Sequence, residues 1–254
     1  MAQAIQPDSG PIRPEPSGEL ASGAPLLDSG GSPVAAEVLP LRSPEVIDSH
    51  PVQRAVKRVI DIVGSLVLIV LLLTLGLVVA IAIKVDSRGP VLFVQRRVGR
   101  NGVEFPLLKF RTMVRDGEGA LLGHISTDED LLREWEHARK LRNDPRVTRV
   151  GAFLRRFSID ELPQLLNVVV GNMSLVGPRP VPRDEIAYFG QRAGQILDVR
   201  PGLTGLWAVS GRSEVSYEER VELEYRYVVD WSLWMDARIL VRTIPAVFRG
   251  HGAY

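Results

Sequence analysis

The sequence predicts an α/β chain of the mixed α+β type, a membrane-associated domain that begins with a membrane-embedded helix. Three observations support this fold class. A stretch of 22 uncharged residues runs from Ile62 to Ile83, two β-prone segments flank an Asn101-Gly102 turn, and apolar residues recur at helical spacing near the C-terminus. We expect three parts, in chain order: a disordered tail at 1–50, a membrane-embedded helix at 51–88 and a mixed α+β domain at 89–254.

The first 50 residues have the composition of a disordered tail. They contain 8 Pro, 5 Gly and 7 Ser and no aromatic residue, so they have too little apolar surface to form a core. They also lack the basic start and apolar centre of a signal peptide.

The tail and the remainder of the chain carry opposite net charges. Residues 1–50 carry two Arg against seven acidic residues, which leaves −5, and the other 29 basic and 23 acidic residues leave +6. A basic body is expected to bind an anionic partner such as a phosphate, a nucleotide or a lipid surface. A nucleic acid is not expected, because no basic run is interleaved with aromatic residues. The chain has no Cys, which excludes disulfides and thiol chemistry.

The uncharged stretch from Ile62 to Ile83 predicts a helix that enters a membrane. A helix of 22 residues is about 33 Å long, enough to cross a hydrocarbon core. Basic residues flank both of its ends: Arg54, Lys57 and Arg58 before it, and Lys84, Arg88, Arg96, Arg97 and Arg100 after it. Basic flanks prefer the cytoplasmic side. A helix that enters the bilayer, bends and returns would place both flanks there.

The segment around Asn101-Gly102 predicts a β-hairpin. Val91–Val94 begin one strand and Phe105–Met113 form the other. Alternation along the second strand places Lys109 and Arg111 on one face. Two neighbouring cations can hold a phosphate, although an ordinary solvated face has the same pattern.

Two adjacent carboxylates, Asp160 and Glu161, follow Arg155 and precede a helical pattern of apolar residues. Ser158-x-x-Glu161 has the form of a capping box. Alternatively, Asp160 is itself the N-cap, because Pro163 suits the first helical turn. In either register Asp160 would lie exposed at the opening of a helix, where backbone N–H groups favour negative charge. Acidic groups and arginines at such a point suit a phosphorylated, metal-bound substrate.

Two other short motifs can serve a phosphorylated substrate. The sequence GPRP at 177–180 predicts a stiff turn that presents the Arg179 guanidinium. Asp128-Glu129-Asp130 forms a D-x-D motif, which can hold a divalent metal with a nucleotide diphosphate but is also common in acidic turns.

The C-terminal third predicts two helices. Ser216-x-x-Glu219 is a capping box that opens a helix through about Val229. The following segment, Trp231–Phe248, has a broad apolar face bordered by Trp and Arg. This composition is typical of an amphipathic helix at a membrane interface, and a buried core helix shares the pattern.

Several ordered motifs resemble those of one family. FLRRFSIDELPQL at 153–165, VGNMSLVGPRP at 170–180, KFRTM at 109–113 and RPGLTGLW at 200–207 are similar to motifs of the bacterial sugar transferases, the monotopic polyprenyl-phosphate phosphoglycosyl transferases. The resemblance extends from Arg54 to the C-terminus. The Gly-Ala-Tyr ending resembles exopolysaccharide-type members.

The resemblance implies a re-entrant helix broken at a Ser-Pro pair, with a catalytic domain at 89–254 on the cytoplasmic face of the inner membrane. This sequence has Leu73-Thr74 where that pair is expected. A bend is still compatible with the sequence, because Thr74 can hydrogen-bond to a carbonyl one turn earlier and Gly76 weakens a helix.

The resemblance also implies a reaction. Asp160 matches the family nucleophile, expected to attack the β-phosphate of a UDP-sugar and expel UMP, and Glu161 matches the carboxylate expected to hold Mg²⁺. The covalent sugar phosphate would then pass to polyprenyl (undecaprenyl) phosphate, the first membrane step of exopolysaccharide or glycan synthesis. The residues expected to bind phosphate are Arg155, Arg179, Lys109, Arg111 and Arg212.

Two other functions are compatible with the sequence. The first is a metal-dependent glycosyltransferase that uses Asp128 and Asp130 and releases UDP. The second is a non-enzymatic membrane scaffold, in which the acidic residues at 160 and 161 only cap a helix.

Overall fold

The computed structural model describes residues 51–115, 117, 119, 123, 144–211 and 215–249. The tail at 1–50, the D-x-D motif at 128–130 and Arg212 lie outside the described residues. The described residues belong to one compact unit that combines helices with two small sheets. This architecture confirms the mixed α+β class.

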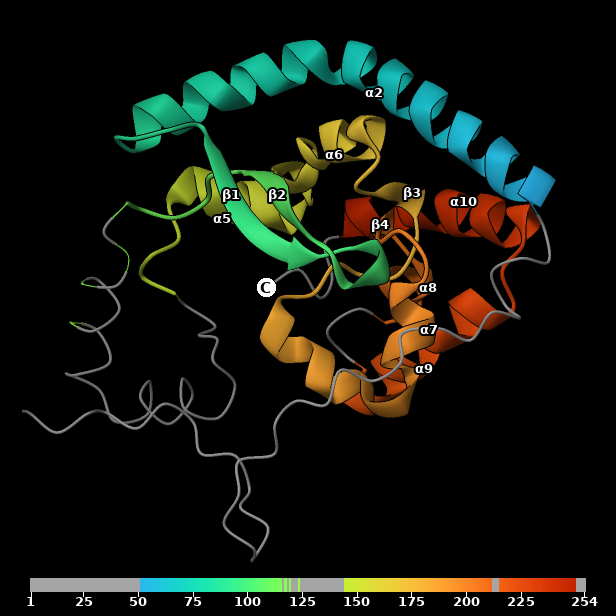
Figure 1. Ribbon diagram of the computed structural model, residues 1–254. Coiled ribbons are helices and arrows are strands. Elements are labelled where there is room, and N and C mark those ends of the chain that lie inside the picture. The colour runs from blue at the N-terminus through green and yellow to red at the C-terminus, as the bar shows by residue number, and fades with distance from the viewer. Residues whose placement is uncertain are drawn as a thin grey trace, which may run out of the picture. The chain divides into compact units, whose positions relative to one another are not determined.

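The helices are α2 (Pro51–Asp86), α5 (Arg149–Arg156), α6 (Gln164–Val170), α7 (Ala193–Leu197), α8 (Leu206–Val209), α9 (Tyr217–Val229) and α10 (Leu233–Arg249) (Figure 1). The 3-10 segments are η1 (Arg100–Gly102), η2 (Ile159–Glu161) and η3 (Arg183–Arg192). The strands are β1 (Leu92–Val98), β2 (Glu104–Phe110), β3 (Ser174–Val176) and β4 (Gly202–Thr204). β1 pairs antiparallel with β2, and β3 pairs parallel with β4.

Helix α2 arches over the domain and is attached to it near both ends (Figure 1). Near its first end, the Asp61 carboxylate accepts a hydrogen bond of 3.0 Å from the backbone N–H of Leu175. Just beyond its last residue, Arg111 Nη2 donates to the Ser87 carbonyl oxygen at 2.7 Å. Its buried residues are Asp61, Ser65, Val79 and Ile83. Both flanks of the apolar stretch therefore lie against the same domain.

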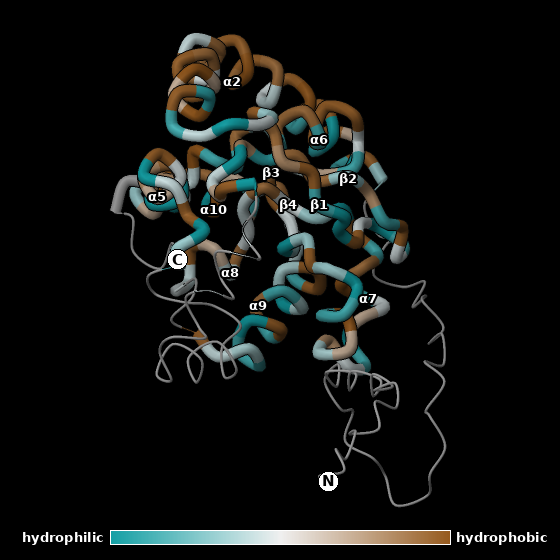
Figure 2. Tube along the Cα trace, turned by 90° about the vertical axis from the view of Figure 1, so that its left-hand side faces the viewer, coloured by the Kyte–Doolittle hydropathy of each residue, from teal (hydrophilic) through white to brown (hydrophobic). Residues whose placement is uncertain are grey.

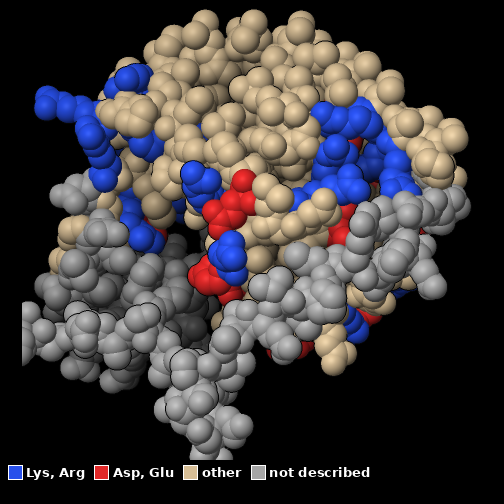
Figure 3. Space-filling model, viewed as in Figure 1, with Lys and Arg blue, Asp and Glu red and all other residues tan. Residues whose placement is uncertain are grey.

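The outer face of α2 is apolar and exposed. Figure 2 shows apolar residues along the helix, and Figure 3 shows an uncharged surface over it in that view. The helix is long and apolar enough to cross a membrane, and only 11% of its most apolar window is buried. Packing within the domain therefore does not account for its hydrophobicity, which is compatible with membrane association. α2 is uninterrupted through Leu73-Thr74, and the re-entrant path stays a prediction.

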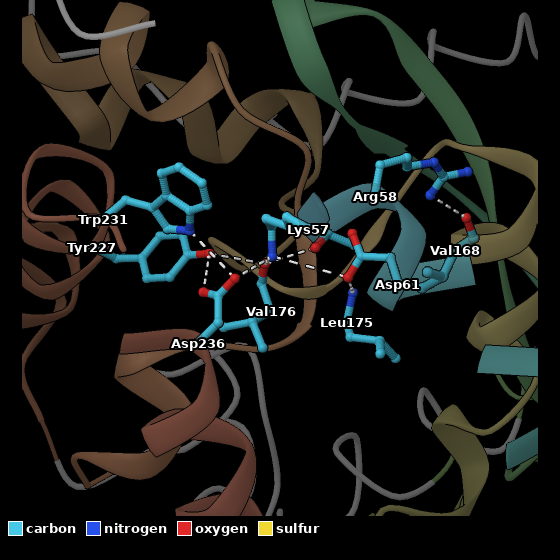
Figure 4. A network of polar contacts seen from close by, with 10 residues as sticks. Lys57, Arg58, Asp61, Val168, Leu175, Val176, Tyr227, Trp231 and Asp236 are labelled. Carbon is cyan, nitrogen blue, oxygen red and sulfur yellow. Dashed lines mark hydrogen bonds and ion pairs between the residues drawn. The ribbon is translucent and has the colours of Figure 1, made fainter. Parts of the chain in front are cut away.

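The first end of α2 is joined to three other elements by one polar network (Figure 4). Lys57 Nζ donates to Asp236 of α10 at 2.6 Å and to the Val176 carbonyl of β3 at 2.9 Å. Asp236 also accepts hydrogen bonds from the Tyr227 hydroxyl of α9 at 2.8 Å and from Trp231 Nε1 at 3.3 Å. This network fixes the start of α2 on the domain.

The predicted hairpin is confirmed. β1 and β2 pair in register from Leu92 opposite Phe110 to Val98 opposite Glu104. Asn101 has a φ of 57°, the left-handed conformation that asparagine tolerates in a tight turn. The second strand ends at Phe110 instead of Met113, because Met113 leaves β1 and forms an isolated bridge elsewhere. Arg111 thus lies beyond the strand.

The main core lies between the hairpin, α6, the β3–β4 sheet and the C-terminal helices. Its buried residues are Phe105, Leu107, Leu165, Val168, Met173, Leu175, Val176, Tyr227, Val228 and Ile239. The sequence predicts one buried helical face formed by Leu162, Leu165, Leu166 and Val169. This prediction is partly wrong, because Leu166 is exposed whereas Val168 is fully buried.

The two C-terminal helices form as predicted. α9 begins with a complete capping box, in which Ser216 Oγ accepts from the Glu219 N–H and the Glu219 side chain accepts from the Ser216 N–H. α10 buries Ile239, whereas Val241 and Ile244 of its apolar face are exposed. The exposed part of this face is available to an apolar surface outside the domain.

Candidate active site

The two adjacent carboxylates lie in a turn between α5 and α6. Thr148 caps α5 by accepting a hydrogen bond from the Gly151 N–H at 3.0 Å. After α5 ends, Ser158 takes the left-handed conformation, with φ 55°, and reverses the chain. A non-glycine residue there costs about 1–2 kcal/mol, which the surrounding packing must offset. The 3-10 turn η2 follows and contains Asp160 and Glu161.

The predicted helix caps are wrong. A capping residue needs extended backbone, and the left-handed Ser158 makes no capping hydrogen bond with its side chain. Asp160 is not the cap either, because α6 begins at Gln164 and Pro163 precedes it. The two carboxylates therefore lie a full turn before the helix, and the helix N-terminus does not account for their placement.

Asp160 is buried, which contradicts the expected exposure. Only 8% of the residue is accessible, because η2 packs against β2 and α5. Burial raises the pKa of Asp160 to about 6, and the charge of Glu161 adds to this effect, whereas Lys109 and Arg155 oppose it. At neutral pH the ionised form is still the majority. A carboxylate in this state has little hydration to lose before it attacks another group.

Lys109 and Glu161 form the shortest ion pair at this site. Lys109 Nζ lies 2.8 Å from Glu161 Oε1 and 4.0 Å from Asp160 Oδ2. Phe105 and Leu107, on the same face of β2 as Lys109, are buried in the core. The hairpin therefore directs the ammonium group inward, onto the carboxylates.

Arg155 is the second cation at the carboxylates. Its Nε donates to Thr112 Oγ1 at 2.9 Å, which fixes the guanidinium beside the end of the hairpin. Burial lowers the pKa of Arg155, and the nearby charge of Asp160 opposes that shift. The predicted residues Lys109, Arg155, Asp160 and Glu161 are therefore brought together by β2, α5 and η2.

Two of the predicted phosphate-binding residues make contacts with other parts of the chain, and their role at the carboxylates stays a prediction. Arg111 is buried and donates to the Ser87 carbonyl and hydroxyl oxygens, so it holds the end of α2. Arg179 stacks over the ring of Trp207, with its Cζ 4.9 Å from the ring centroid. Neither residue makes a hydrogen bond or ion pair to Asp160 or Glu161 among the contacts of the described residues. Arg212 lies outside these residues.

Sequence reasoning missed the surroundings of Arg179. Burial lowers the pKa of Arg97 of β1 and of Arg220 of α9, and the nearby charge of Arg179 adds to the shift in both. The three arginines lie far apart in the chain, so no spacing rule brings them together. From the sequence, Arg97 is only one residue in a basic flank of the membrane segment.

The carboxylate pair suits a magnesium ion. No group of three or more His, Cys, Asp or Glu side chains in the described part of the chain is placed to hold a metal. Mg²⁺, however, is commonly held by one or two carboxylates together with substrate phosphates and water. Asp160 and Glu161 are adjacent in one turn and supply such a donor set.

Comparisons with known proteins agree with these features. Residues 52–250 match the family model described as bacterial sugar transferase. The chain is 46% identical over 205 residues to the exopolysaccharide production protein ExoY of Rhizobium meliloti, covering 81% of this chain and 91% of that protein.

Two further relatives have names that describe a reaction. The undecaprenyl-phosphate galactose phosphotransferase of Salmonella typhimurium is 44% identical over 201 residues, which cover 79% of this chain and 42% of that protein. The UDP-glucose:undecaprenyl-phosphate glucose-1-phosphate transferase of Caulobacter vibrioides is 41% identical over 206 residues, which cover 78% and 72%. With a family model that spans most of its length, this chain belongs to the bacterial sugar transferase family.

Proposed function

We propose that this protein transfers a hexose-1-phosphate from a UDP-sugar to polyprenyl phosphate and releases UMP. The observation that carries the proposal is the buried carboxylate of Asp160, held beside Lys109, Glu161 and Arg155 in a member of this family. The names of the relatives supply the substrate class, since they describe sugar-phosphate transfer to undecaprenyl phosphate. The product would begin the membrane stage of exopolysaccharide or glycan synthesis.

In the first step, an Asp160 oxygen attacks the β-phosphorus of the UDP-sugar. A bond forms between the carboxylate and phosphorus while the bond to the bridging oxygen breaks, and UMP leaves with that oxygen. Asp160 is suited to this step because a pKa of about 6 leaves it ionised at neutral pH. The result is an aspartyl phosphosugar.

In the second step, a phosphate oxygen of polyprenyl phosphate attacks the same phosphorus. The carboxylate leaves and is regenerated, and the product is a polyprenyl diphosphate sugar. Division of the transfer into two displacements allows one carboxylate to serve two substrates in turn. Lys109 and Arg155 offset the negative charge that two phosphorylated substrates bring to a buried site.

The metal fits the same carboxylates. Glu161 would hold Mg²⁺ while Asp160 attacks, and the bound ion would offset charge on the substrate phosphates. Lys109 then lies beside both carboxylates and limits their mutual repulsion.

The location that we propose is the cytoplasmic face of the inner membrane, with α2 embedded from that side. Support comes from the exposed apolar face of α2 and from the attachment of both its ends to one domain. A cavity of about 110 Å³ near the start of α2 is lined by five basic residues. These residues are Arg54, Lys57, Arg58, Arg100 and Arg200. Such a surface suits anionic lipid headgroups, and Figure 3 shows basic side chains gathered below the uncharged surface over α2.

The test is a turnover assay of the purified full chain in detergent with Mg²⁺, polyprenyl phosphate and a panel of UDP-sugars. We expect one or more sugars to yield UMP and a lipid-linked sugar diphosphate. Release of UDP instead would support the glycosyltransferase alternative. Absence of any Mg²⁺-dependent turnover across the panel, with the protein folded, would support a scaffold.

A further inference from the structure

Two arginines from distant parts of the chain stack on Trp207, and a third lies within electrostatic range of both. Arg179 Cζ lies 4.9 Å and Arg220 Cζ lies 5.1 Å from the centroid of the Trp207 ring. Arg97 is close enough to both for their charges to lower its pKa, although burial is the largest cause of that shift. We refer to Arg97, Arg179 and Arg220 as the arginine cluster. It is formed by β1, the turn after β3 and α9.

The acidic groups around the arginine cluster do not balance its charge. Glu185 forms an ion pair with Arg220, with a carboxylate oxygen 3.6 Å from Arg220 Nη1. Glu224 is fully buried beneath the cluster, and burial raises its pKa to about 7, although the Arg179 N–H hydrogen bond and the arginine charges oppose that shift. Burial therefore favours the neutral form of Glu224 and weakens the charge that it sets against the cluster. Asp184 is exposed and acts on Arg97 through solvent.

The cluster also contains unused hydrogen-bond donors. Arg97 Nε and Arg220 Nε and Nη2 are buried and have no hydrogen-bond partner among the described residues. Folded proteins leave few buried donors unpaired. The free-energy cost of an unpaired donor is highest when the donor is charged. Outside the cluster, Arg111 Nε and Nη1 are also unpaired among the described residues, whereas Arg58 and Arg155 donate to defined oxygens. The cluster therefore has free donors, and an acceptor on another molecule can pair with them.

The cluster is open on one side. Arg179 is exposed, whereas Arg97 and Arg220 are half-buried behind it. Trp207 and Tyr217 hold the Arg220 guanidinium in place, with its Cζ 5.1 Å from each ring centroid. An anion that approaches Arg179 thus meets guanidinium groups that are already oriented, which lowers the entropic cost of binding.

We propose that the arginine cluster is a second phosphate site, separate from Asp160. Its ligand is a phosphate group, carried either by a nucleotide or by an isoprenoid lipid. Arginine suits this ligand because a guanidinium matches the geometry of phosphate oxygens. The choice between these two carriers rests on the proposed function, whereas the phosphate site itself rests on the cluster alone.

The hairpin sets the distance between this site and the carboxylates. Lys109 pairs with Phe93, and Arg97 pairs with Phe105, so both cations lie on the same face of the hairpin. Phe93 and Arg97 are four residues apart on β1, which corresponds to about 13 Å. Lys109 Nζ pairs with Glu161, whereas Arg97 is grouped with Arg179 and Arg220, so the two cations belong to different groups of charges. An extended substrate with two anionic parts, or two substrates side by side, can occupy both.

The test measures binding of two probes, UDP and farnesyl phosphate, to the full chain in detergent by calorimetry. The variants are Arg220→Gln and Arg97→Gln, and the matched control is Arg226→Gln, an exposed arginine of the same helix α9 that contacts Asp230. We expect either cluster variant to weaken at least one probe by about tenfold, the effect of one lost charge-assisted hydrogen bond. The control should leave both affinities unchanged. Circular dichroism and melting curves establish that the variants are folded.

The results distinguish the two carriers. Weaker binding of UDP alone assigns the cluster to the nucleotide, and weaker binding of farnesyl phosphate alone assigns it to the lipid. If both probes weaken, the two ligands share the site. Unchanged affinity for both probes in folded Arg97→Gln and Arg220→Gln proteins would overturn the proposal. Because binding is measured without turnover, a failure of UMP release in the wild type would count against the proposed reaction only.

Discussion

Lys109 binds Glu161 more closely than Asp160. The ammonium nitrogen is 2.8 Å from Glu161 Oε1 and 4.0 Å from Asp160 Oδ2. Lys109 thus lies next to both carboxylates, reduces their repulsion and holds Asp160 only at the longer distance. A carboxylate held in this way is ionised, yet Lys109 does not occupy its oxygens with a short ion pair.

Asp160→Asn should abolish both turnover and the covalent intermediate. An amide oxygen is a poor nucleophile and cannot form the acyl phosphate. The measurement is retention of labelled phosphate on the protein after incubation with a UDP-sugar labelled at the β-phosphate. Retained label on a folded Asp160→Asn protein would show that another residue is the nucleophile.

The same substitution should stabilise the fold at neutral pH. The pKa of Asp160 is raised from 3.8 to about 6 in the folded protein, so the folded state binds the proton more tightly than the unfolded state. This contribution to stability is complete below pH 4 and is lost as the pH rises through 6. The asparagine side chain is never charged, and we expect Asp160→Asn to gain about 1–3 kcal/mol over wild type between pH 4 and pH 7. Unfolding curves of both proteins at the two pH values provide the measurement. If the free energies of unfolding of the two proteins differed by the same amount at pH 4 and at pH 7, the raised pKa of Asp160 would be contradicted.

Lys109→Met should shift the acid limb of the pH–rate profile upward. Lys109 lowers the pKa of Asp160, so its removal raises that pKa and reduces the ionised fraction near pH 7. Activity should fall most near neutrality and partly recover at higher pH. A uniform loss at all pH values would show that Lys109 acts mainly on the substrate instead of on Asp160.

Arg155→Gln should lower kcat/KM by about 30–100-fold, as expected for loss of a charge-assisted contact to phosphate worth 2–3 kcal/mol. Arg156→Gln is the matched control, because Arg156 is the adjacent residue but is exposed. Steady-state kinetics on both variants give the comparison. Equal effects of the two substitutions would remove Arg155 from the site.

Asp236→Ala should destabilise the protein and loosen the start of α2. The change leaves the buried Tyr227 hydroxyl and the partly buried donors of Lys57 and Trp231 without their shared acceptor, at a cost of about 3 kcal/mol. Asp230→Ala, which removes an exposed carboxylate 3.4 Å from Arg226, serves as the control. Unfolding in urea and protease cleavage near residue 54 report the two effects. Similar stability of the two variants would contradict the role assigned to the network.

The sequence alone was sufficient for features that depend on near neighbours in the chain. The Asn101-Gly102 turn, the Ser216 capping box and the apolar stretch of α2 all follow from local backbone preference or composition, and the structure contains each of them. The motif around Asp160 and the other family motifs, which occur together in one order, were sufficient to identify the family.

Tertiary packing decided what local patterns leave open. Ser158-x-x-Glu161 meets the requirements of a capping box, yet packing of η2 against β2 and α5 places Ser158 in the left-handed conformation and buries Asp160. Likewise, Arg97 and Arg220 join Arg179 only because β1, α9 and the turn after β3 meet in space. The sequence determined which charges are present, and the fold determined which of them share a site, because electrostatic interaction depends on distance in space and on burial, not on distance along the chain.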